Sequence, residues 1–480
     1  MAFNRLTSAD LAALEDICPG GVLVGDSVSE DYQHDEMPIY GSFAPEAMVL
    51  PASTQAVSAV LAYCHSRSLP VTPRGSGTGL CGGAVPIHGG VLLSTERMNH
   101  ILELDADNLC VTVEAGVLLM ELADYALERG LLYPPEPGEK SATLGGNVMT
   151  NAGGMKAVKY GVTRDYVLGM EVVLADGRIL NLGGKLSKNS SGYSLLHLMI
   201  GSEGTLGIVT KLILRLVPKP QKTVSLLVPF DSLEQCIETV PRLLAANLGP
   251  TAVEFMQREV ILESEKYLGV SFPDKSSNAY LLLSFDGDSR QGVDAVCERA
   301  AEICIESGAR DALYADTSER LSGLWGARGA FLEAIKSSTR DMDECDVVVP
   351  RTAIAEFVTF THQLESEAGV RIRSFGHAGD GNIHIYLCRD DLSESAWQPK
   401  LEAAMRRLYQ KAEALGGKVS GEHGIGHAKI EYLRQSEGEL SMALMVGIKQ
   451  TFDPKGILNP GKVTDVHRKF ADFDEEVHRD

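Results

Sequence analysis

Glycine is concentrated in one part of this 480-residue chain: residues 41–219 hold 24 of the 48 glycines in well under half of the length. Segment 73–83 alone carries glycine at positions 75, 77, 79, 82 and 83, directly after a predicted strand at 69–73. Alternating glycines let successive backbone N–H groups converge on one point, which suits a diphosphate. Position 80 is leucine and no amphipathic helix follows, so this is not a Rossmann fingerprint. A glycine-rich surface turn is the alternative.

Composition excludes several classes of protein. The length allows two to four domains, and 44% apolar with 23% charged residues is the ordinary globular mixture. A net charge of −21 disfavours nucleic acid and anionic lipid as partners. The nine cysteines are scattered without a CxxC, which indicates neither a disulfide framework nor an iron–sulfur cluster. With no signal-type or membrane-spanning apolar run, we expect a cytoplasmic protein, with peripheral membrane attachment through a partner left open.

Two further glycine-rich regions extend the first. Segments 134–138, 141–147 and 151–154 combine glycine with Asn and Thr, and segment 201–208 repeats that chemistry before a predicted strand. Small residues let a flat ligand lie against the backbone. Each segment alone is more typical of a loop, but together they indicate an extended nucleotide with an isoalloxazine-sized ring.

The pattern of predicted secondary structure changes near residue 222. Before it, the pattern predicts helices at 51–68 and 118–128 and a hairpin around Asp176 and Gly177. After it, predicted strands alternate with amphipathic helices at 232–246, 290–307, 316–336 and 352–368. This alternation predicts an α+β sheet with helices on one face.

A candidate metal site lies in this second part. Segment 376–384 cannot continue a helix and predicts a tight loop that brings His377 and His384 together, while Glu422 offers a carboxylate. Two imidazoles and one carboxylate suit Zn²⁺, Mn²⁺ or Fe²⁺ with an open position. The alternative is histidines that only satisfy hydrogen bonds in strands. His423 is then a natural general base, and Arg328 is either a carboxylate-binding fork or a solvated helix residue.

These motifs, in this order, resemble the FAD-linked oxidases of the vanillyl-alcohol-oxidase type. Within that family the sequence is most similar to the glycolate oxidase FAD subunit and bacterial D-lactate dehydrogenases, with D-2-hydroxyglutarate dehydrogenase more distant. The resemblance covers residues 40–463, a range that ends with the tail motif at 459–461.

The resemblance implies an α+β fold with three parts. These are a vanillyl-alcohol-oxidase-type FAD-binding domain (1–220, core 41–219), a ferredoxin-like α+β substrate domain (221–425) and a C-terminal segment (426–480) that returns to the flavin. The residues expected at the FAD are Pro73, Arg74, Gly75, Ser76, Gly77, Thr78, Gly79, Gly82, Pro137, Gly138, Thr143, Gly145, Gly146, Asn147, Asn151, Gly153, Glu203, Gly204, Gly207, Ile208 and Asn459.

The resemblance also assigns roles in the second part. It implies that His377, His384 and Glu422 bind a divalent metal, that His423 is the base and that Arg328 holds the substrate carboxylate. We expect non-covalent FAD, because no histidine occurs in 73–83. Glu344 and Tyr386 stand where the hydroxyglutarate enzymes have lysine and asparagine, which favours a short monocarboxylate.

The resulting hypothesis is an FAD- and metal-dependent dehydrogenase that oxidises a small D-2-hydroxy acid, D-lactate or next glycolate, to the 2-oxo acid. Electrons would pass to an external carrier such as an electron-transferring flavoprotein or an iron–sulfur subunit. A D-2-hydroxyglutarate dehydrogenase, a metal-dependent hydrolase and a non-catalytic flavin subunit are the alternatives.

Overall fold

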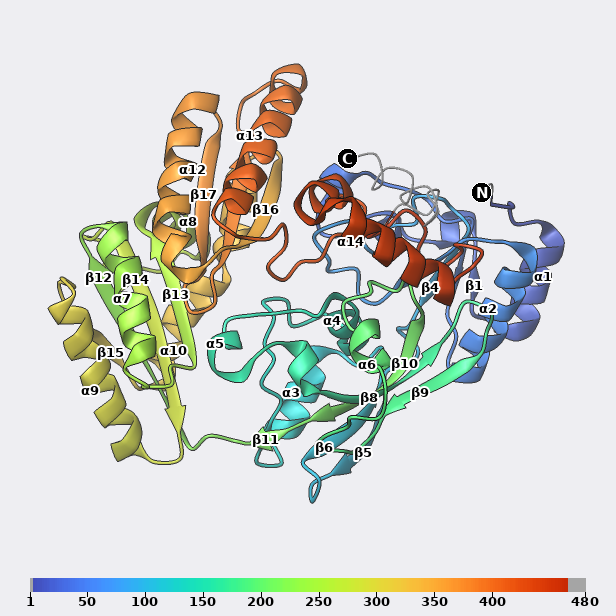
Figure 1. Cartoon of the computed structure of the whole chain (residues 1–480), viewed down its shortest axis with the longest axis horizontal. Coiled ribbons are helices and arrows are strands. Elements are labelled where there is room, and N and C mark those ends of the chain that lie inside the picture. Colours follow the sequence, from blue (N-terminus) through green and yellow to red (C-terminus); the bar gives the residue numbers. More distant parts are fainter. Residues whose placement is uncertain (1–2, 465–480) are drawn as a thin grey trace. The chain divides into compact units, whose positions relative to one another are not determined.

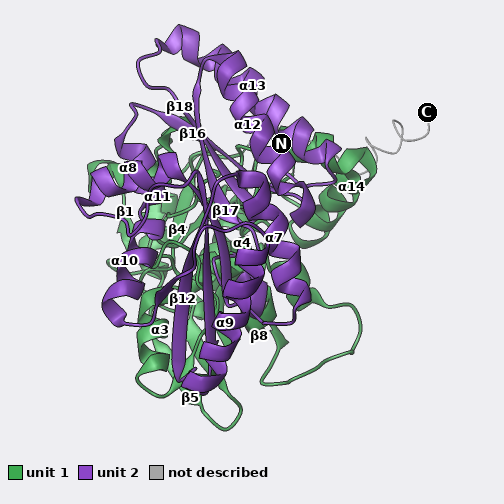
Figure 2. Cartoon of the chain, turned by 90° about the vertical axis from the view of Figure 1, so that its left-hand side faces the viewer, with its two compact units in different colours: residues 1–152, 162–218, 423–480 green, residues 153–161, 219–422 purple. Residues whose placement is uncertain are grey.

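A computed structural model, which describes residues 3–464, divides the chain into two compact units (Figures 1 and 2). Unit 1 contains residues 1–152, 162–218 and 423–480, and unit 2 contains residues 153–161 and 219–422. Each unit therefore combines segments that are far apart in the sequence.

The first sheet of unit 1 has the strand order β1-β2-β4-β3, in which β2, β4 and β3 run parallel. Ser53 caps the start of α2, and Ser68 ends that helix in the left-handed conformation, so the helix predicted at 51–68 is confirmed. Leu61 of α2 packs in an apolar core with Val91 of β4. The elements are α1 (Ser8–Ile17), β1 (Val22–Leu23), η1 (Gly25–Ser27), η2 (Glu30–Gln33), η3 (Pro38–Tyr40), β2 (Ala47–Val49), α2 (Thr54–Arg67), β3 (Val71–Arg74) and β4 (Val91–Ser94).

The second sheet of unit 1 is antiparallel, in the order β5-β6-β10-β8-β9. Strands β8 and β9 pair directly, which confirms the hairpin predicted at Asp176 and Gly177. Its strands are β5 (Ile101–Asp105), β6 (Cys110–Glu114), β8 (Val167–Val173), β9 (Ile179–Gly183) and β10 (Ile208–Arg215). Around it lie α3 (Leu119–Leu127), β7 (Leu131–Leu132), α4 (Leu144–Thr150), η4 (Thr163–Tyr166), α6 (Leu195–Met199), β11 (Val217–Pro218) and α14 (Ile430–Phe452).

The chain returns to unit 1 after residue 422. Leu458 forms a parallel bridge with Val71 of β3 and is fully buried in the core of the first sheet. The buried Lys449 at the end of α14 donates to the carbonyl oxygens of Thr205 and Leu458 and pairs with Asp453. The return segment is thus part of the core of unit 1.

Unit 2 is built on one seven-stranded sheet in the order β15-β12-β14-β13-β17-β18-β16. Strands β17 and β18 pair as an antiparallel hairpin, and its turn is the tight loop predicted within 376–384. The strands are β12 (Lys222–Phe230), β13 (Ala252–Gln257), β14 (Ala279–Gly287), β15 (Leu313–Ala315), β16 (Met342–Val348), β17 (Arg371–His377) and β18 (Asn382–Cys388).

Helices cover both faces of this sheet, not one face as predicted. Successive strand residues point to opposite faces. Gln257 of β13 contacts His362 of α12, whereas Glu254, three residues earlier, contacts Arg328 of α10. The predicted helix at 316–336 is also divided at Ala330. The helices are α5 (Ala157–Tyr160), α7 (Leu233–Ala245), α8 (Arg258–Leu268), α9 (Arg290–Glu306), α10 (Ser318–Gly329), α11 (Phe331–Ser337), η5 (Arg351–Ala353), α12 (Ile354–Ala368) and α13 (Glu394–Ala414).

Among the residues that the structure describes, no helix has the length and apolar character needed to cross a bilayer. All nine cysteines lie in this part of the chain and are buried, and no disulfide joins them. Both findings concern only residues 3–464.

Candidate active site

Unit 1 brings three of the predicted glycine-rich segments into contact. A Cβ atom on Gly75 would lie 2.1 Å from Oγ1 of Thr143, and one on Gly204 would lie 2.4 Å from Cγ of Pro73. Atoms at such distances overlap, so only glycine allows the loops at 73–83, 141–147 and 201–208 to approach this closely. We call these three loops the cradle.

Arg74 of the cradle and Asn459 of the return segment bind backbone carbonyl oxygens. Arg74 is buried and donates to the carbonyl oxygens of His34 and Asp31. The amide of Asn459 donates to the carbonyl oxygens of Gly83 and Glu203. These two side chains thus hold the backbone in and around the cradle in place.

Glu203 joins the cradle to the return segment. Its carboxylate accepts hydrogen bonds from the backbone N–H groups of Ile425 and Gly426, both at 2.7 Å. Burial raises the pKa of Glu203, and these two hydrogen bonds oppose that rise. A Cβ on Gly424 would lie 2.8 Å from its Oε1, so the segment passes directly over this carboxylate.

Two polar atoms of the cradle, Nε of Arg74 and Nδ2 of Asn147, lack a hydrogen-bond partner within residues 3–464. Asn147 on α4 is 5% exposed, and its Nδ2 makes no hydrogen bond to residues 3–464. A buried amide donor costs free energy unless a ligand or water satisfies it. The hydroxyl of Thr143 is occupied as the cap of α4, where it accepts from the N–H of Gly146. This donor and the glycine-lined loops fit FAD.

The remaining predicted FAD residues are divided between the units. Ser76 donates to the carbonyl of Ser141, and Asn151 ends α4 in the left-handed conformation, with its side chain accepting from Arg164 N–H. Gly138 has open space around its Cα, because a Cβ there would meet no atom within 4 Å. Gly153 lies in unit 2, where a Cβ would sit 2.5 Å from Oε2 of Glu422.

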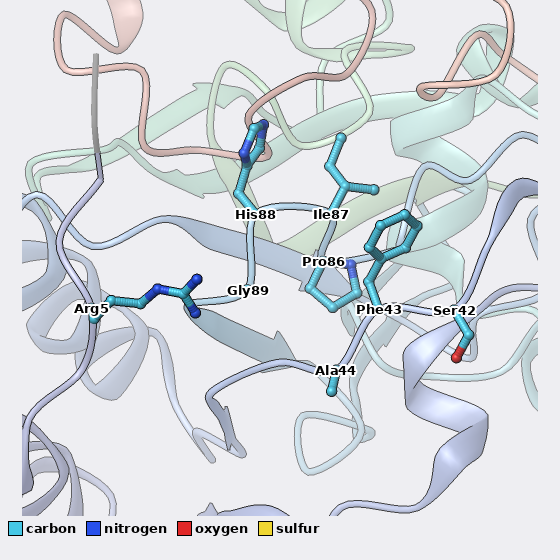
Figure 3. A pocket seen from close by; sticks show the side chains of 8 residues that line it. All are labelled: Arg5, Ser42, Phe43, Ala44, Pro86, Ile87, His88 and Gly89. Carbon is cyan, nitrogen blue, oxygen red and sulfur yellow. The ribbon is translucent and has the colours of Figure 1, made fainter.

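A pocket of about 460 Å³ on unit 1 contains none of the predicted cofactor residues. Figure 3 shows its lining side chains, which come from the segments around residue 43 and residue 88. Arg5 at its edge pairs with Glu46. The lining residues are Arg5, Ser42, Phe43, Ala44, Pro86, Ile87, His88 and Gly89.

Unit 2 brings the three predicted metal ligands together. Nε2 of His377 lies 3.4 Å from Nε2 of His384, and each of these atoms lies 3.4 Å from Oε1 of Glu422. Three ligands of a tetrahedral ion with bonds of about 2.0–2.1 Å are separated by about 3.3–3.4 Å. The donor set and its spacing therefore fit one face of a tetrahedral metal site.

The register of the hairpin explains how the two imidazoles meet. Strand β17 pairs His377 with Asn382 and Phe375 with His384. His377 and Phe375 share one face of the sheet, as do Asn382 and His384, because side chains alternate along a strand. The two histidines are therefore diagonal neighbours on that face.

Buried carboxylates lie behind each ligand. Glu254 of β13 meets Nδ1 of His377 at 2.7 Å, and Glu344 of β16 meets Nδ1 of His384 at 3.2 Å. Such partners orient metal-bound imidazoles in many proteins.

Asp346 holds the loop that carries Glu422. Its Oδ2 accepts from the hydroxyl of Ser420 and from the backbone N–H groups of Gly421 and Glu422, at 3.0–3.1 Å. Its Oδ1 accepts from Asn382 at 2.6 Å. This fully buried carboxylate fixes the third ligand relative to the hairpin.

The electrostatics of this cluster favour a cation. Burial by itself lowers the pKa of His377, but the carboxylates of Glu254 and Glu422 outweigh it and hold that pKa well above its usual value. Without a metal ion, a proton on His377 thus compensates the acidic surroundings. A divalent ion would supply that positive charge instead.

Comparisons with known proteins cover both parts of the chain. Residues 45–183 match the model of an FAD binding domain, and residues 219–463 match the C-terminal domain of FAD linked oxidases. A D-lactate dehydrogenase of Anaerostipes hadrus is 52% identical over 96% of this chain and 98% of its own length. The chain belongs to the FAD-linked oxidase family.

Other members are also similar. Glycolate oxidase subunit GlcD of Bacillus subtilis is 40% identical over 90% of this chain and 91% of its own. The mitochondrial D-2-hydroxyglutarate dehydrogenase of Bos taurus is 35% identical over 97% of this chain and 85% of its own length. Among solved structures, p-cresol methylhydroxylase with bound substrate superimposes with a TM-score of 0.80 at 19% identity, covering 97% of this chain and 99% of its own, which shows a shared fold. The protein is an FAD-dependent oxidoreductase of the 2-hydroxy-acid dehydrogenase type.

The cradle predicts how this FAD-linked oxidase responds to a small change. Gly75→Ala should weaken FAD binding at least about tenfold, or about 1.4 kcal/mol, because the added methyl group displaces the Thr143 side chain. Gly323→Ala, in open space on α10, should change FAD affinity less than about twofold. Titration of the apoproteins with FAD measures both. Equal affinity in the two variants would contradict this role of the close approach.

Arg328 is held within unit 2 by one residue. Its Nε and Nη2 contact Oε2 of Glu254 at 2.9 and 2.6 Å, and its guanidinium lies 4.5 Å from the centre of the Phe375 ring. Within the described residues its Nη1 makes no hydrogen bond, so that edge is available to a ligand. His423 directly follows Glu422 in the chain and lies in unit 1.

Sequence reasoning missed Glu254 and Asp346. Glu254 is the one carboxylate of β13, whereas Asp346 shares β16 with Asp343 and Glu344, and both Glu254 and Asp346 are fully buried. Acidic residues are almost never fully buried without a partner. A single acidic residue inside a predicted core strand was therefore the signal that could have found Glu254.

Proposed function

We propose that this chain oxidises a small D-2-hydroxy acid, D-lactate and next glycolate, to the 2-oxo acid. The observation that carries the proposal is the 3.4 Å triangle of His377, His384 and Glu422 in a chain with an FAD-binding domain. Bound FAD would accept the electron pair of the substrate, and a bound divalent ion would make the 2-hydroxyl group more acidic.

The chain's own residues would bind the substrate and move its proton. Arg328 would bind the substrate carboxylate through Nη1, since its other edge is held by Glu254. His423 would accept the proton of the 2-hydroxyl group as general base. His377, His384 and Glu422 would hold the metal ion.

Two observations support a short substrate with one carboxylate. Glu344 is 1% exposed and lies 3.2 Å from His384, so a second substrate carboxylate on this side would meet a buried negative charge. Phe375 and Tyr386 stack beside it with ring centres 5.5 Å apart, which adds an apolar surface. The 52% identical relative is named for D-lactate, which agrees with a three-carbon acid.

The reduced flavin would pass its electrons to an external carrier. The scattered cysteines offer no sequence motif for an in-chain iron–sulfur cluster. An electron-transferring flavoprotein or an iron–sulfur subunit is the class of partner we propose. The net charge of −21 suits docking to a basic patch on such a partner.

Anaerobic mixing of the purified holoenzyme with a panel of D- and L-2-hydroxy acids tests the proposal. We expect D-lactate to bleach the flavin absorbance fastest, glycolate to follow, and L-lactate to be at least about a hundredfold slower. Rapid bleaching by D-2-hydroxyglutarate instead would assign the chain to that substrate. If no acid bleaches the flavin, the result would favour a non-catalytic flavin subunit. If the purified protein is colourless, the result would favour a metal-dependent hydrolase.

A further inference from the structure

Glu254 contacts two functional groups at once. It lies on β13 with 0% of its surface exposed. Its Oε1 is 2.7 Å from Nδ1 of His377, and its Oε2 is 2.9 Å from Nε and 2.6 Å from Nη2 of Arg328. Both oxygens of one buried carboxylate are thus committed, one to a metal-ligand histidine and one to the candidate substrate arginine.

The first contact determines which nitrogen of His377 can bind a metal. An ionised carboxylate only accepts hydrogen bonds, so Nδ1 must carry the hydrogen that faces it. In neutral imidazole the lone pair is then on Nε2, the atom that faces His384 and Glu422. Glu254 therefore selects the tautomer that presents Nε2 to the ion.

The second contact fixes the arginine relative to the ion. A guanidinium that is held on its Nε and Nη2 edge cannot rotate about its terminal bonds without breaking both contacts. The same carboxylate also holds His377. The distance between the metal position and Nη1 of Arg328 is therefore set by the buried side chain of Glu254. A hydroxy acid has its carboxylate next to its hydroxyl carbon, and this spacing must be constant to bind both groups.

We propose that Glu254 is a positioning residue, which sets the tautomer of His377 and the orientation of Arg328 together. The claim about Arg328 and the substrate rests on the proposed function. The claim about His377 concerns only the binding of a metal ion. Partners of this kind typically change metal affinity 10–100-fold.

Glu254→Gln is the test variant, because an amide keeps the size but cannot accept from both partners. If its oxygen accepts from Arg328, its NH₂ group faces Nδ1 and favours a hydrogen on Nε2, which blocks the metal ligand. We expect the affinity of the apoprotein for Zn²⁺, measured by competition with a chelating dye, to fall 10–100-fold. FAD content should be unchanged, because the cradle is in unit 1.

Glu344→Gln is the matched control. Glu344 faces His384 in the same way at 3.2 Å, but Arg328 pairs with Glu254. Both variants should lose Zn²⁺ affinity. At saturating metal, Glu254→Gln should keep a raised KM for D-lactate, by about tenfold or more, because Arg328 has lost its carboxylate partner. Two results for Glu254→Gln would overturn the proposal. One is a Zn²⁺ affinity within twofold of wild type, and the other is a KM that saturating metal returns to the wild-type value.

A measurement on the unaltered protein covers the case in which Glu254→Gln does not fold. Nitrogen-15 spectra of the Zn²⁺-loaded holoenzyme report the histidine tautomers directly. His377 should carry its hydrogen on Nδ1, and a hydrogen on Nε2 would overturn the inference. If wild-type protein is not bleached by any 2-hydroxy acid, the proposed function fails, yet the Zn²⁺ and tautomer results still decide the role of Glu254.

Discussion

His384→Ala should remove metal and activity together. The substitution deletes one of three donor atoms that lie 3.4 Å apart, and two ligands hold a divalent ion poorly. Lewis-acid polarisation is worth several kcal/mol, and each 1.4 kcal/mol is a factor of ten, so the rate should fall at least about a hundredfold. Elemental analysis and D-lactate-dependent flavin reduction measure the two effects on the same sample.

His362→Ala provides the matched control for this loss. His362 belongs to the same unit, is exposed and bonds to Gln257 on the opposite face of the sheet. That variant should retain metal and most of the activity. Both variants should retain FAD, because the cradle belongs to unit 1. Full activity in metal-free wild-type protein would exclude the metal from the reaction.

The local part of the candidate metal site was predictable from the sequence. His377 and His384 flank a segment that only a tight turn can accommodate, and the hairpin register then places them on one face. Glu422 was harder, since its loop, about forty residues away, is joined to the sheet by the buried carboxylate of Asp346 and by the bridge between Val348 and Lys418. No local pattern encodes that long-range contact.

Charged residues in the glycine-rich motifs were the least predictable. Arg74 and Glu203 were predicted at the FAD as members of their motifs, and the structure adds that Arg74 donates to carbonyl oxygens and that Glu203 accepts from backbone N–H groups. A motif identifies the loop, but packing decides whether a side chain faces the ligand or supports the loop. The roles of these residues therefore followed only from the structure.

Two predicted helices also differed in how well the sequence predicted them. The helix at 51–68 had a capping serine and a clear apolar period, and it formed as α2. The helix predicted at 316–336 divides at Ala330, where the chain turns between Arg328, which meets Glu254, and Phe331, which packs on Phe375. Periodicity alone cannot encode a break that tertiary contacts stabilise on both sides.

His423→Ala should slow turnover by about 10²–10⁴-fold, the usual worth of a general base, while FAD and metal stay bound. His423 directly follows Glu422, whose backbone N–H donates to the carboxylate of Asp346. The loss should appear in kcat more than in KM, because the proton moves only in the reacting complex.

Added imidazole separates proton transfer from a structural role. If His423 accepts the proton, free imidazole should restore part of the rate in His423→Ala, with a dependence on pH that follows imidazole itself. The visible spectrum and metal content of the variant should match wild type, since the cradle and the ligand triangle are intact. Unchanged turnover in His423→Ala would remove this residue from the mechanism, and a slow variant that imidazole cannot rescue would assign the loss to packing of the return segment.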